Sequence, residues 1–393
     1  MAARFLPLIL SFKPTCFPGV PLLCLRAFSS GDLKTPLQQW TLAVSPFTKV
    51  RAQLCCDLTV RPLDPHSFPE ADQLFITVFG SGAEHDLKPH HLQVHYNHTD
   101  KELIIKDNVS SHVSVHLTAP IKNDLFIETQ GTGNVSIQGM ENDVCKVQTE
   151  RGHCVLTSLR SHHVSVQSGG DITGFGTIHG NVDVCSTGDS TVDLHKIQGT
   201  TMNVSTEHGL LKVKAIYAES TTVMSSSGQI QLGHVHGDAS VQSVMGDVAV
   251  GMLLHAHTFI TFISFIYTLS SIFHYWFPLD SSNGSLKVST KSGNIDIYVG
   301  QSGSADLSTQ EGSVSVRVPA NITAALQLSG SSVEISPEIC LIEAQRETTV
   351  TGMTLTGHFN GPSATEQWIK TQAAKGTISL RIQSWLETLR LGS

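Results

Sequence analysis

A short sequence phrase that determines the fold occurs as Gly228-Gln229-Ile230-Gln231-Leu232 and again, eighteen residues later, as Gly246-Asp247-Val248-Ala249-Val250. Each copy has a glycine, a polar residue, and then apolar residues at alternate positions. Alternation at a period of two defines a short strand with one buried face. The glycine and the Asp or Asn that often follows it provide the backbone freedom that a sharp corner needs.

The phrase recurs from about residue 131 with a nearly constant step. Its leading glycines are at positions 133, 152, 170, 188, 209, 228 and 246, and later copies begin at Gly293 and Gly312. A second strand, such as Thr191-Val192-Asp193-Leu194, lies about half a period further on. Strands of four or five residues cannot bury an apolar side alone, but stacked coils with a common interior of Val and Ile can.

The sequence therefore predicts an all-β fold, a β-solenoid of stacked short strands with about 18–19 residues per coil. A β-sandwich also contains many short strands, but it would show irregular loop lengths. We expect an N-terminal β cap over residues 40–110, the solenoid over residues 111–320 and a C-terminal cap over residues 321–393. Such caps cover the open ends of the stack, where exposed strand edges would invite aggregation.

The first residues of the chain have the composition of a targeting segment. From Met1 to Gly31 there is no Asp or Glu, whereas Arg4, Lys13 and Arg26 are basic. This composition predicts a mitochondrial transit peptide over residues 1–28, cleaved between Phe28 and Ser29. The alternative is a secretory signal, and hence a secreted protein, but the apolar run there is short and interrupted by prolines.

An apolar insert over residues 251–279 interrupts the repeat. Residues 252–277 contain no Lys, Arg, Asp or Glu, and the segment is long enough for a membrane span of about 20 residues. However, the step from Gly246 to Gly293 is 47, so removing 29 residues restores a step of 18. A single membrane crossing would also separate the two halves of the solenoid. We expect an ejected loop or hairpin, with membrane contact through residues 252–277 as the alternative.

The sequence predicts no site for chemistry: we assign no catalytic, cofactor-binding or metal-binding residue and expect no cofactor. His90, His91, His95 and His98 cluster, but alternate strand residues face opposite ways and no carboxylate or cysteine completes a ligand set. The Gly169–Gly176 stretch lacks the register of calcium or phosphate loops and is interpreted as a solenoid corner.

Aspartates and cysteines are interpreted in the same structural way. Turn chemistry accounts for the aspartates that accompany glycine at the corners, namely Asp171, Asp189, Asp193, Asp238 and Asp247. The eight cysteines show no CxxC spacing, so neither a zinc site nor a disulfide framework is indicated. The net charge of −8 argues against nucleic acid as a partner, because phosphate binding needs a basic surface.

A resemblance to a known family supports this interpretation. The run SVHLTAPIKNDLFIET at residues 114–129 leads into Gly131-Thr132-Gly133-Asn134-Val135. With the Gly-Asp/Asn-Val phrases that follow, it resembles the putative-adhesin β-solenoid domain that is widespread in bacteria, over roughly residues 110–320. The whole chain resembles a vertebrate member of that family. The resemblance implies a β-solenoid and an interaction role, and it brings no catalytic residues. The apolar insert departs from the family pattern.

Three functions remain open at this stage. The first is a non-enzymatic mitochondrial scaffold whose solenoid faces bind a protein partner. The second is a carbohydrate-binding or polysaccharide-acting solenoid, which would need exposed Asp, His and Arg residues from successive coils to line one groove. The third is a membrane-associated protein that uses residues 252–277.

Overall fold

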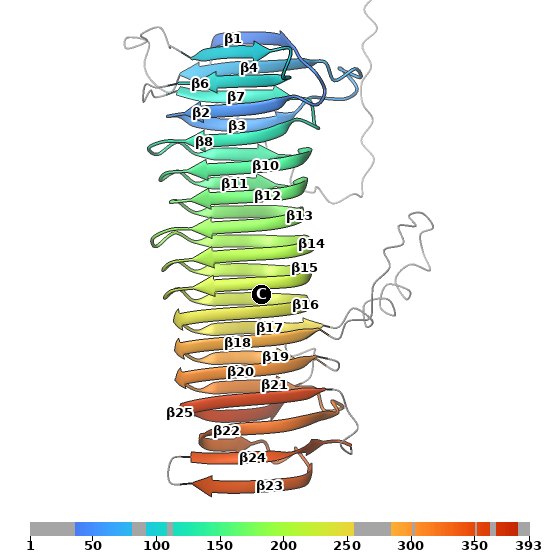
Figure 1. The fold of residues 1–393 in the computed structure, drawn as a ribbon, viewed down its shortest axis with the longest axis vertical. Coiled ribbons are helices and arrows are strands. Elements are labelled where there is room, and N and C mark those ends of the chain that lie inside the picture. The colour runs from blue at the N-terminus through green and yellow to red at the C-terminus, as the bar shows by residue number, and fades with distance from the viewer. Residues whose placement is uncertain are drawn as a thin grey trace, which may run out of the picture. The chain divides into compact units, whose positions relative to one another are not determined.

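The computed structural model of the chain is an all-β structure of stacked coils (Figure 1). It describes residues 36–80, 92–107, 113–254, 284–300, 303–349, 352–361 and 367–383. All of these belong to one compact unit, Pro36–Ser393. The predicted transit peptide over residues 1–28 lies outside the described residues.

The central coils confirm the predicted solenoid. Successive strands pair in parallel, and the partners are one coil apart: Val192 pairs with Leu211, and Leu211 with Ile230. These strands are β8 (Asp124–Thr129), β9 (Val135–Gln138), β10 (Glu141–Thr149), β11 (Cys154–Thr157), β12 (Arg160–Ser168), β13 (Ile172–Ser186), β14 (Val192–Thr206), β15 (Leu211–Ser225), β16 (Ile230–Met245), β17 (Val248–Leu254), β18 (Ser285–Ser292), β19 (Ile295–Val299), β20 (Ser304–Glu311) and β21 (Val314–Val318).

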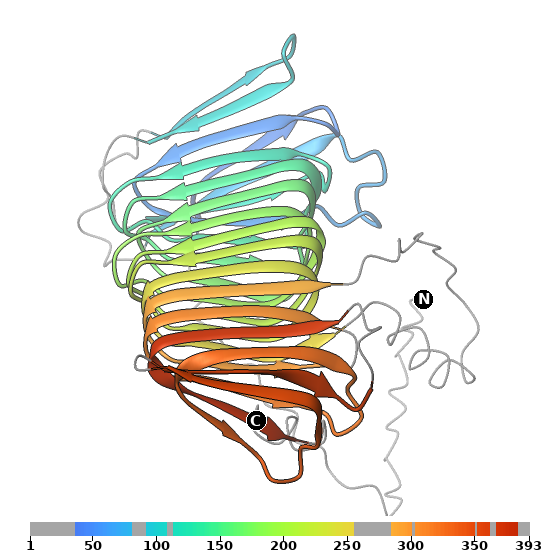
Figure 2. The same cartoon turned by 60° about the horizontal axis from the view of Figure 1, so that its bottom comes forward.

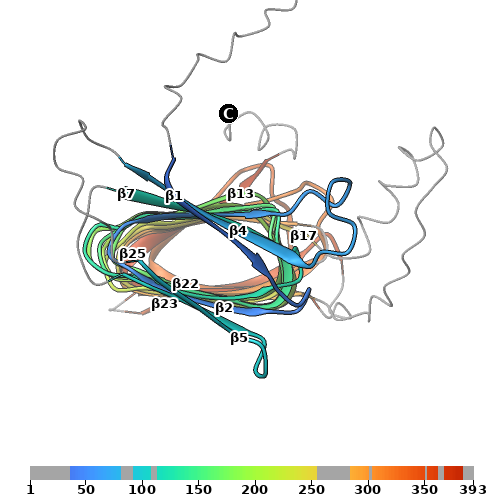
Figure 3. The same ribbon diagram turned by 90° about the horizontal axis from the view of Figure 1, so that it is seen from above.

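Each coil contributes to two faces, seen end-on in Figure 3, which enclose one interior. What we call the β2 face contains β8, β10, β12, the second halves of β13 to β16, β18 and β20. The opposite β3 face contains β9, β11, the first halves of β13 to β16, β17, β19 and β21. Equivalent inward residues stack in columns; one column contains Ile172, Val192, Leu211, Ile230 and Val248, all at most 1% exposed.

A second inward column consists of hydroxyls, which the sequence analysis did not identify. It lies where the β2 face ends, and its buried members are Thr129, Thr149, Ser168, Ser186, Thr206, Ser225, Ser243, Thr290 and Thr309. Several donate to corner carbonyls: Thr149 Oγ1 to Gly152 O at 2.8 Å and Ser225 Oγ to Gly228 O at 3.0 Å. These members of the column therefore satisfy backbone acceptors that the turns leave inside the coil.

The recurring glycines form a column at the following corner. A Cβ on Gly170 would lie 2.5 Å from Gly152 O, and one on Gly152 or Gly228 would collide with the carbonyl oxygen of the glycine one coil earlier. Glycine therefore permits the close approach of stacked backbones. Gly188 is not a member: a Cβ on Gly209 meets Ser190 O instead, and Gly188 lies in the turn with φ +67°. This explains the uneven steps of 18 and 21 on either side of it.

At the N-terminal end, strands that are far apart in sequence form coils. The strands here are β1 (Pro36–Ala43), β2 (Lys49–Leu54), β3 (Asp57–Pro62), β4 (Gln73–Gly80), β5 (Gln93–Asn97), β6 (Glu102–Lys106) and β7 (Val113–Ala119). Val50 pairs in parallel with both Leu103 and Leu125, so the β2–β3 coil lies between β6–β7 and β8–β9. Part of the segment interpreted as a cap thus continues the stack.

Antiparallel strands cover this end. β4 pairs with β7 and with β1 on the β3 face, and β5 pairs with β6 on the β2 face. Figure 2 shows these strands beyond the parallel coils. Because β1 and β5 each pair on one side only within the described residues, they are the terminal strands of the two faces.

The C-terminal layers are out of sequence order. They are β22 (Ala324–Ile335), β23 (Leu341–Thr349), β24 (Gly352–Phe359) and β25 (Trp368–Ile382). β25 pairs in parallel with β20 and β21 on one side and with β22 on the other. β24 and then β23 follow in antiparallel order. The last described strand is therefore an inner layer of the stack.

The coil closes across the expected insert. Leu254 pairs with His236, and the backbone of Gly284 lies against Gly237, the next residue of β16. Residues 251–254 therefore belong to β17, four residues beyond the start expected for the insert. The remainder, residues 255–279, lies outside the described residues. No helix among the described residues has the length and hydropathy that a membrane crossing requires.

Candidate functional site

The histidine cluster does not come together as a metal site in the described part of the chain. His95 is exposed on β5, and His98 packs its ring edge-on against Tyr96, with centroids 4.6 Å apart. His90 and His91 lie outside the described residues. No group of three or more His, Cys, Asp or Glu side chains among the described residues is placed to hold a metal ion.

The corner aspartates connect neighbouring coils. Asp171 Oδ1 accepts the Thr191 backbone N–H at 2.8 Å, and this hydrogen bond lowers the pKa of the Asp171 carboxyl. Asp238 and Asp247 accept backbone N–H groups one coil further on, from Ser285 and Asn294, both at 2.7 Å. Asp189 and Asp193 are exposed. Gly169 and Gly170 form the corner before β13, where added Cβ atoms would meet backbone of the preceding coil.

Three described cysteines are buried as free thiols. Burial is the main reason that the pKa of Cys56 and of Cys145 is raised to about 12, and it also raises the pKa of Cys154. A thiol with a raised pKa is protonated near neutral pH and is a poor nucleophile. These side chains act as small apolar residues of the interior.

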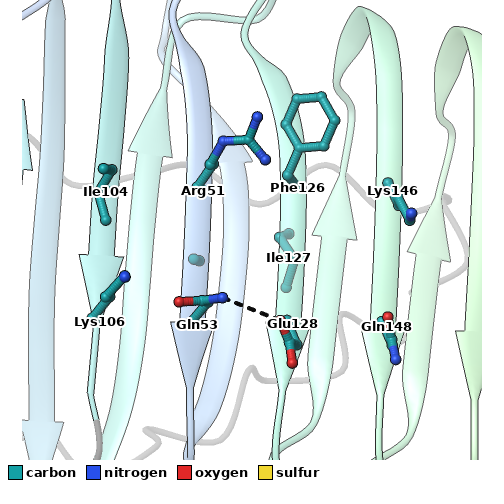
Figure 4. A pocket seen from close by; sticks show the side chains of 10 residues that line it. Arg51, Gln53, Ile104, Lys106, Phe126, Ile127, Glu128, Lys146 and Gln148 are labelled. Atoms are coloured by element: carbon teal, nitrogen blue, oxygen red, sulfur yellow. Dashed lines mark hydrogen bonds between the residues drawn. The ribbon is translucent and has the colours of Figure 1, made fainter. Parts of the chain in front are cut away.

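A shallow depression of about 300 Å³ lies on the β2 face, near the N-terminal end (Figure 4). One row of outward side chains crosses five adjacent strands there: His95 on β5, Ile104 on β6, Arg51 on β2, Phe126 on β8 and Lys146 on β10. Basic and apolar side chains alternate along this row. We call it the cation–apolar row.

Arg51 is held in place within the row. Its guanidinium lies 4.7 Å from the centroid of the Phe126 ring and also pairs with Glu102. A cation over an aromatic face adds an electrostatic attraction to the apolar contact. Ile104 and Phe126 are half-buried on either side of Arg51, so the row presents fixed apolar contacts between basic groups.

The carboxylates around the row are already engaged. Glu102 pairs with Arg51, Glu128 accepts from Gln53 Nε2 at 3.3 Å, and Asp124 Oδ1 accepts the backbone N–H groups of Asp143 and Val144. Figure 4 shows the Gln53–Glu128 contact beside the row.

Two lysines at the rim of the depression have no such neighbour. The side chains of Lys106 on β6 and Lys146 on β10 are exposed, and no ion pair joins either to a carboxylate in the described part of the chain. In a chain with a net charge of −8, two lysines that form no ion pair among the described residues thus lie beside apolar contacts.

No pattern in the sequence indicates this surface. Arg51 and Phe126 are 75 residues apart, and they become neighbours only because β2 is placed beside β8. The repeat gives no signal for that pairing, since β2 precedes the region where the period is regular. The alternation Lys49, Arg51, Gln53 along β2 does indicate an exposed polar edge, but not its neighbours.

A second depression, of about 610 Å³, extends further along the β2 face and has a different character. Its lining is dominated by hydroxyl and amide groups from successive coils, with Ser205, Gln242 and Ser289 among them. Glu207 is the carboxylate of this lining and Lys291 its cation. It does not bring together the exposed Asp, His and Arg residues that a polysaccharide-cleaving groove would need.

A stack of three side chains lies at the end of the β3 face. Lys196 Nζ is 4.8 Å from the centroid of the Tyr217 ring, and the Tyr217 and His236 rings stack with centroids 4.3 Å apart. Burial lowers the pKa of His236 to about 4, with smaller contributions from His234 and Lys196. His236 is thus a neutral packing group near neutral pH.

Comparison with known proteins gives structural likenesses. No protein-family model matches the sequence. A "putative adhesin" from Parabacteroides merdae is similar at 12% identity, over 87% of this chain and 95% of that chain, with a TM-score of 0.32. A "putative adhesin" from Parabacteroides distasonis (12% identity, 87% and 96%, TM-score 0.27) and a "putative cell adhesion protein" from Clostridium sporogenes (10% identity, 89% and 100%, TM-score 0.17) are also similar. At these TM-scores we draw neither family nor function from the likeness.

Proposed function

We propose that this protein is a non-enzymatic, adhesin-like β-solenoid scaffold that binds another protein through the β2 face, and that it works in mitochondria. The single observation that carries the binding role is the cation–apolar row, in which Arg51, Phe126 and Lys146 meet although they are distant in sequence. Stacked coils provide the extended, rigid surface on which such a row can be displayed.

The side-chain types of the row and the fixed position of Arg51 both favour a protein partner. Arginine and aromatic side chains are the types that contribute most binding energy at protein interfaces. Arg51 is pre-organised by Phe126 and Glu102, so less side-chain freedom is lost when a partner binds. The acid-free segment at residues 1–28 supports the mitochondrial part of the proposal.

The test compares crosslinking to mitochondrial proteins for the full chain and for two variants on the same face. We expect the double variant Arg51→Glu/Lys146→Glu to lose a reproducible crosslinked partner. The variant Lys287→Glu should keep it, because Lys287 is an exposed lysine of the same outward column, several coils away. An identical set of partners for both variants, or turnover of a polysaccharide by the purified chain, would overturn the proposal. Fractionation of cells expressing the full chain tests the compartment.

A further inference from the structure

The spacing of Lys106 and Lys146 limits which ligands can contact both lysine side chains. Lys106 is on β6 and Lys146 on β10, with β2 and β8 between them on the same face. Three strand spacings of about 4.8 Å separate these strands by about 14 Å along the stack. Lys106 is also offset by two residues, about 7 Å, along the strand from Ile104 in the row of Lys146, so the two lysines are about 16 Å apart. A ligand that contacts both lysines must therefore carry two negative groups at roughly that separation.

The path between the lysines runs between two rows of side chains. Phe126 and the stem of Arg51 lie on one side of it, and Gln53 and Glu128, which accepts a hydrogen bond from Gln53, lie on the other. The ligand should therefore have an apolar group between its two anionic groups.

An extended peptide has this arrangement of groups. Its side chains alternate between two faces, so residues i, i+2 and i+4 point the same way, and four residues span about 13 Å. The side chains of lysine and glutamate span the remaining few ångströms, so acidic residues at i and i+4 would reach Lys106 and Lys146. An apolar residue at i+2 would lie against Phe126 and Arg51.

We propose that the cation–apolar row, together with Lys106 of the adjacent row, binds an extended acidic segment of the partner protein, with carboxylates at positions i and i+4 and an apolar side chain at i+2. This inference rests on the proposed protein-binding role and specifies the partner's chemistry. A peptide is favoured over an anionic polysaccharide because Arg51 covers a face of the Phe126 ring, the surface on which a sugar ring would stack. The segment crosses the strands, running along the stack from β6 to β10.

The experiment titrates the full chain with fluorescein-labelled synthetic peptides and measures anisotropy. The acidic peptide contains Glu-Ser-Phe-Ser-Glu between Gly-Ser flanks. The amide peptide is a control with the same sequence in which glutamine replaces both glutamates. We expect the acidic peptide to bind at least tenfold more tightly than the amide peptide. A third peptide with adjacent glutamates should bind more weakly than the first, because its carboxylates cannot reach both lysines.

Protein variants locate the binding. We expect Lys106→Gln and Lys146→Gln each to weaken binding of the acidic peptide several-fold, and raising the salt concentration to weaken it for the wild type. Lys287→Gln is the matched control and should bind as the wild type does. Phe126→Leu should weaken binding of both the acidic and the amide peptide, and thermal melts verify that each variant is folded.

Two results would overturn the inference. One is equal affinity for the acidic and amide peptides; the other is equal effects of Lys106→Gln and Lys287→Gln. Binding of a sulfated polysaccharide that depends on Lys106 and Lys146, with no peptide binding, would assign the row to a different class of ligand. If the peptides fail while Arg51→Glu/Lys146→Glu still abolishes crosslinking, the scaffold proposal stands and only the acidic motif is wrong.

Discussion

At the scale of single residues, the stacking of the coils requires positions that have no Cβ atom. The column containing Gly152 and Gly228 exists because stacked backbones approach too closely for any Cβ. The recurring glycines of the sequence therefore reflect steric exclusion of a Cβ atom at one corner. The alternating Val and Ile residues reflect burial of one side of the adjacent strand.

Alanine at Gly152 tests this exclusion. Its Cβ would collide with the carbonyl oxygen of Gly133, a backbone atom that two hydrogen-bonded coils hold in place. We expect Gly152→Ala to lower the free energy of unfolding by about 3 kcal/mol or more. Gly357→Ala on β24, whose Cβ would have its nearest neighbour at 3.4 Å, should change it by less than about 1 kcal/mol. Chemical denaturation of both variants measures the difference, and equal effects would contradict the steric explanation.

The inward hydroxyls differ in whether they are satisfied. Thr149 Oγ1 donates to Gly152 O and lies 2.7 Å from Ser168 Oγ, whereas Thr206 Oγ1 has no hydrogen-bond partner among the described residues. We expect Thr149→Val to cost about 1–2 kcal/mol, and Thr206→Val to be neutral or stabilising. Thermal denaturation of the two variants provides the comparison. A loss of stability in Thr206→Val as large as in Thr149→Val would show that its hydroxyl is bonded.

His236 makes stability depend on pH. Its folded pKa of about 4 is below the ordinary value of 6.5, so the unfolded chain binds the proton more tightly. Its contribution to stability is present above pH 6.5 and is lost as the pH falls toward 4. At about 1.4 kcal/mol per pKa unit, the loss is on the order of 3 kcal/mol.

The variant His236→Gln removes the pH-dependent contribution of His236 to stability. Between pH 7 and pH 4, we expect its free energy of unfolding to rise relative to that of the wild type by on the order of 2–3 kcal/mol. Urea denaturation at several pH values measures this. Parallel pH profiles for the two proteins would mean that His236 titrates alike in the folded and unfolded chains.

At the scale of elements, the ends of the stack are closed by different devices. β1, β4 and β5 close the N-terminal end by antiparallel pairing. At the other end, β23 is exposed along most of its length and carries Glu343, Arg346 and Glu347, and its pairing with β24 has an irregularity between Ile342 and Gln345. Charges and irregular pairing both discourage edge-to-edge association.

β25 is the element on which the C-terminal layers depend. It lies between β21 and β22 and buries Ile369, Ile378 and Leu380, each worth about 1.5–3 kcal/mol. We expect a chain truncated after residue 361 to lose amide protection in β22, β23 and β24 while keeping it in β13 to β16, because coils stabilise mainly their neighbours. Hydrogen exchange with mass spectrometry measures this. Retained protection in β22 would show that it pairs without β25.

The sequence predicts the pairing partners only of the elements that obey its period. Between residues 131 and 250 the paired residues are 18 to 20 positions apart, so the spacing alone places them. β2 pairs with β8 at a separation of 75 and β20 with β25 at 64, and nothing local specifies these partners. The cation–apolar row includes β2, and this is why the fold could be predicted when the candidate site could not.

At the scale of the whole molecule, the solenoid is continuous across residues 254 and 284. Joining them would recreate the backbone path of His236 and Gly237 in the preceding coil. We therefore expect deletion of residues 255–283 to preserve or raise the melting temperature. This places the junctions four residues later than the deletion of residues 251–279 that the sequence suggests, and it keeps β17 intact. Calorimetry of the deletion variant and the full chain is the measurement, and failure of the variant to fold would reject a dispensable insert.

The inner position of β25 also affects how the chain can fold while it emerges from a ribosome or a channel. A ribosome or an import channel releases residues in order, so the coils from β8 to β21 can assemble while the rest of the chain is still emerging. The layer after β21 must wait for β25, which follows β22, β23 and β24 along the chain, and β22 has no permanent neighbour on that side until β25 arrives. Completion of this end of the stack therefore requires more than forty further residues to emerge after β22 has been made.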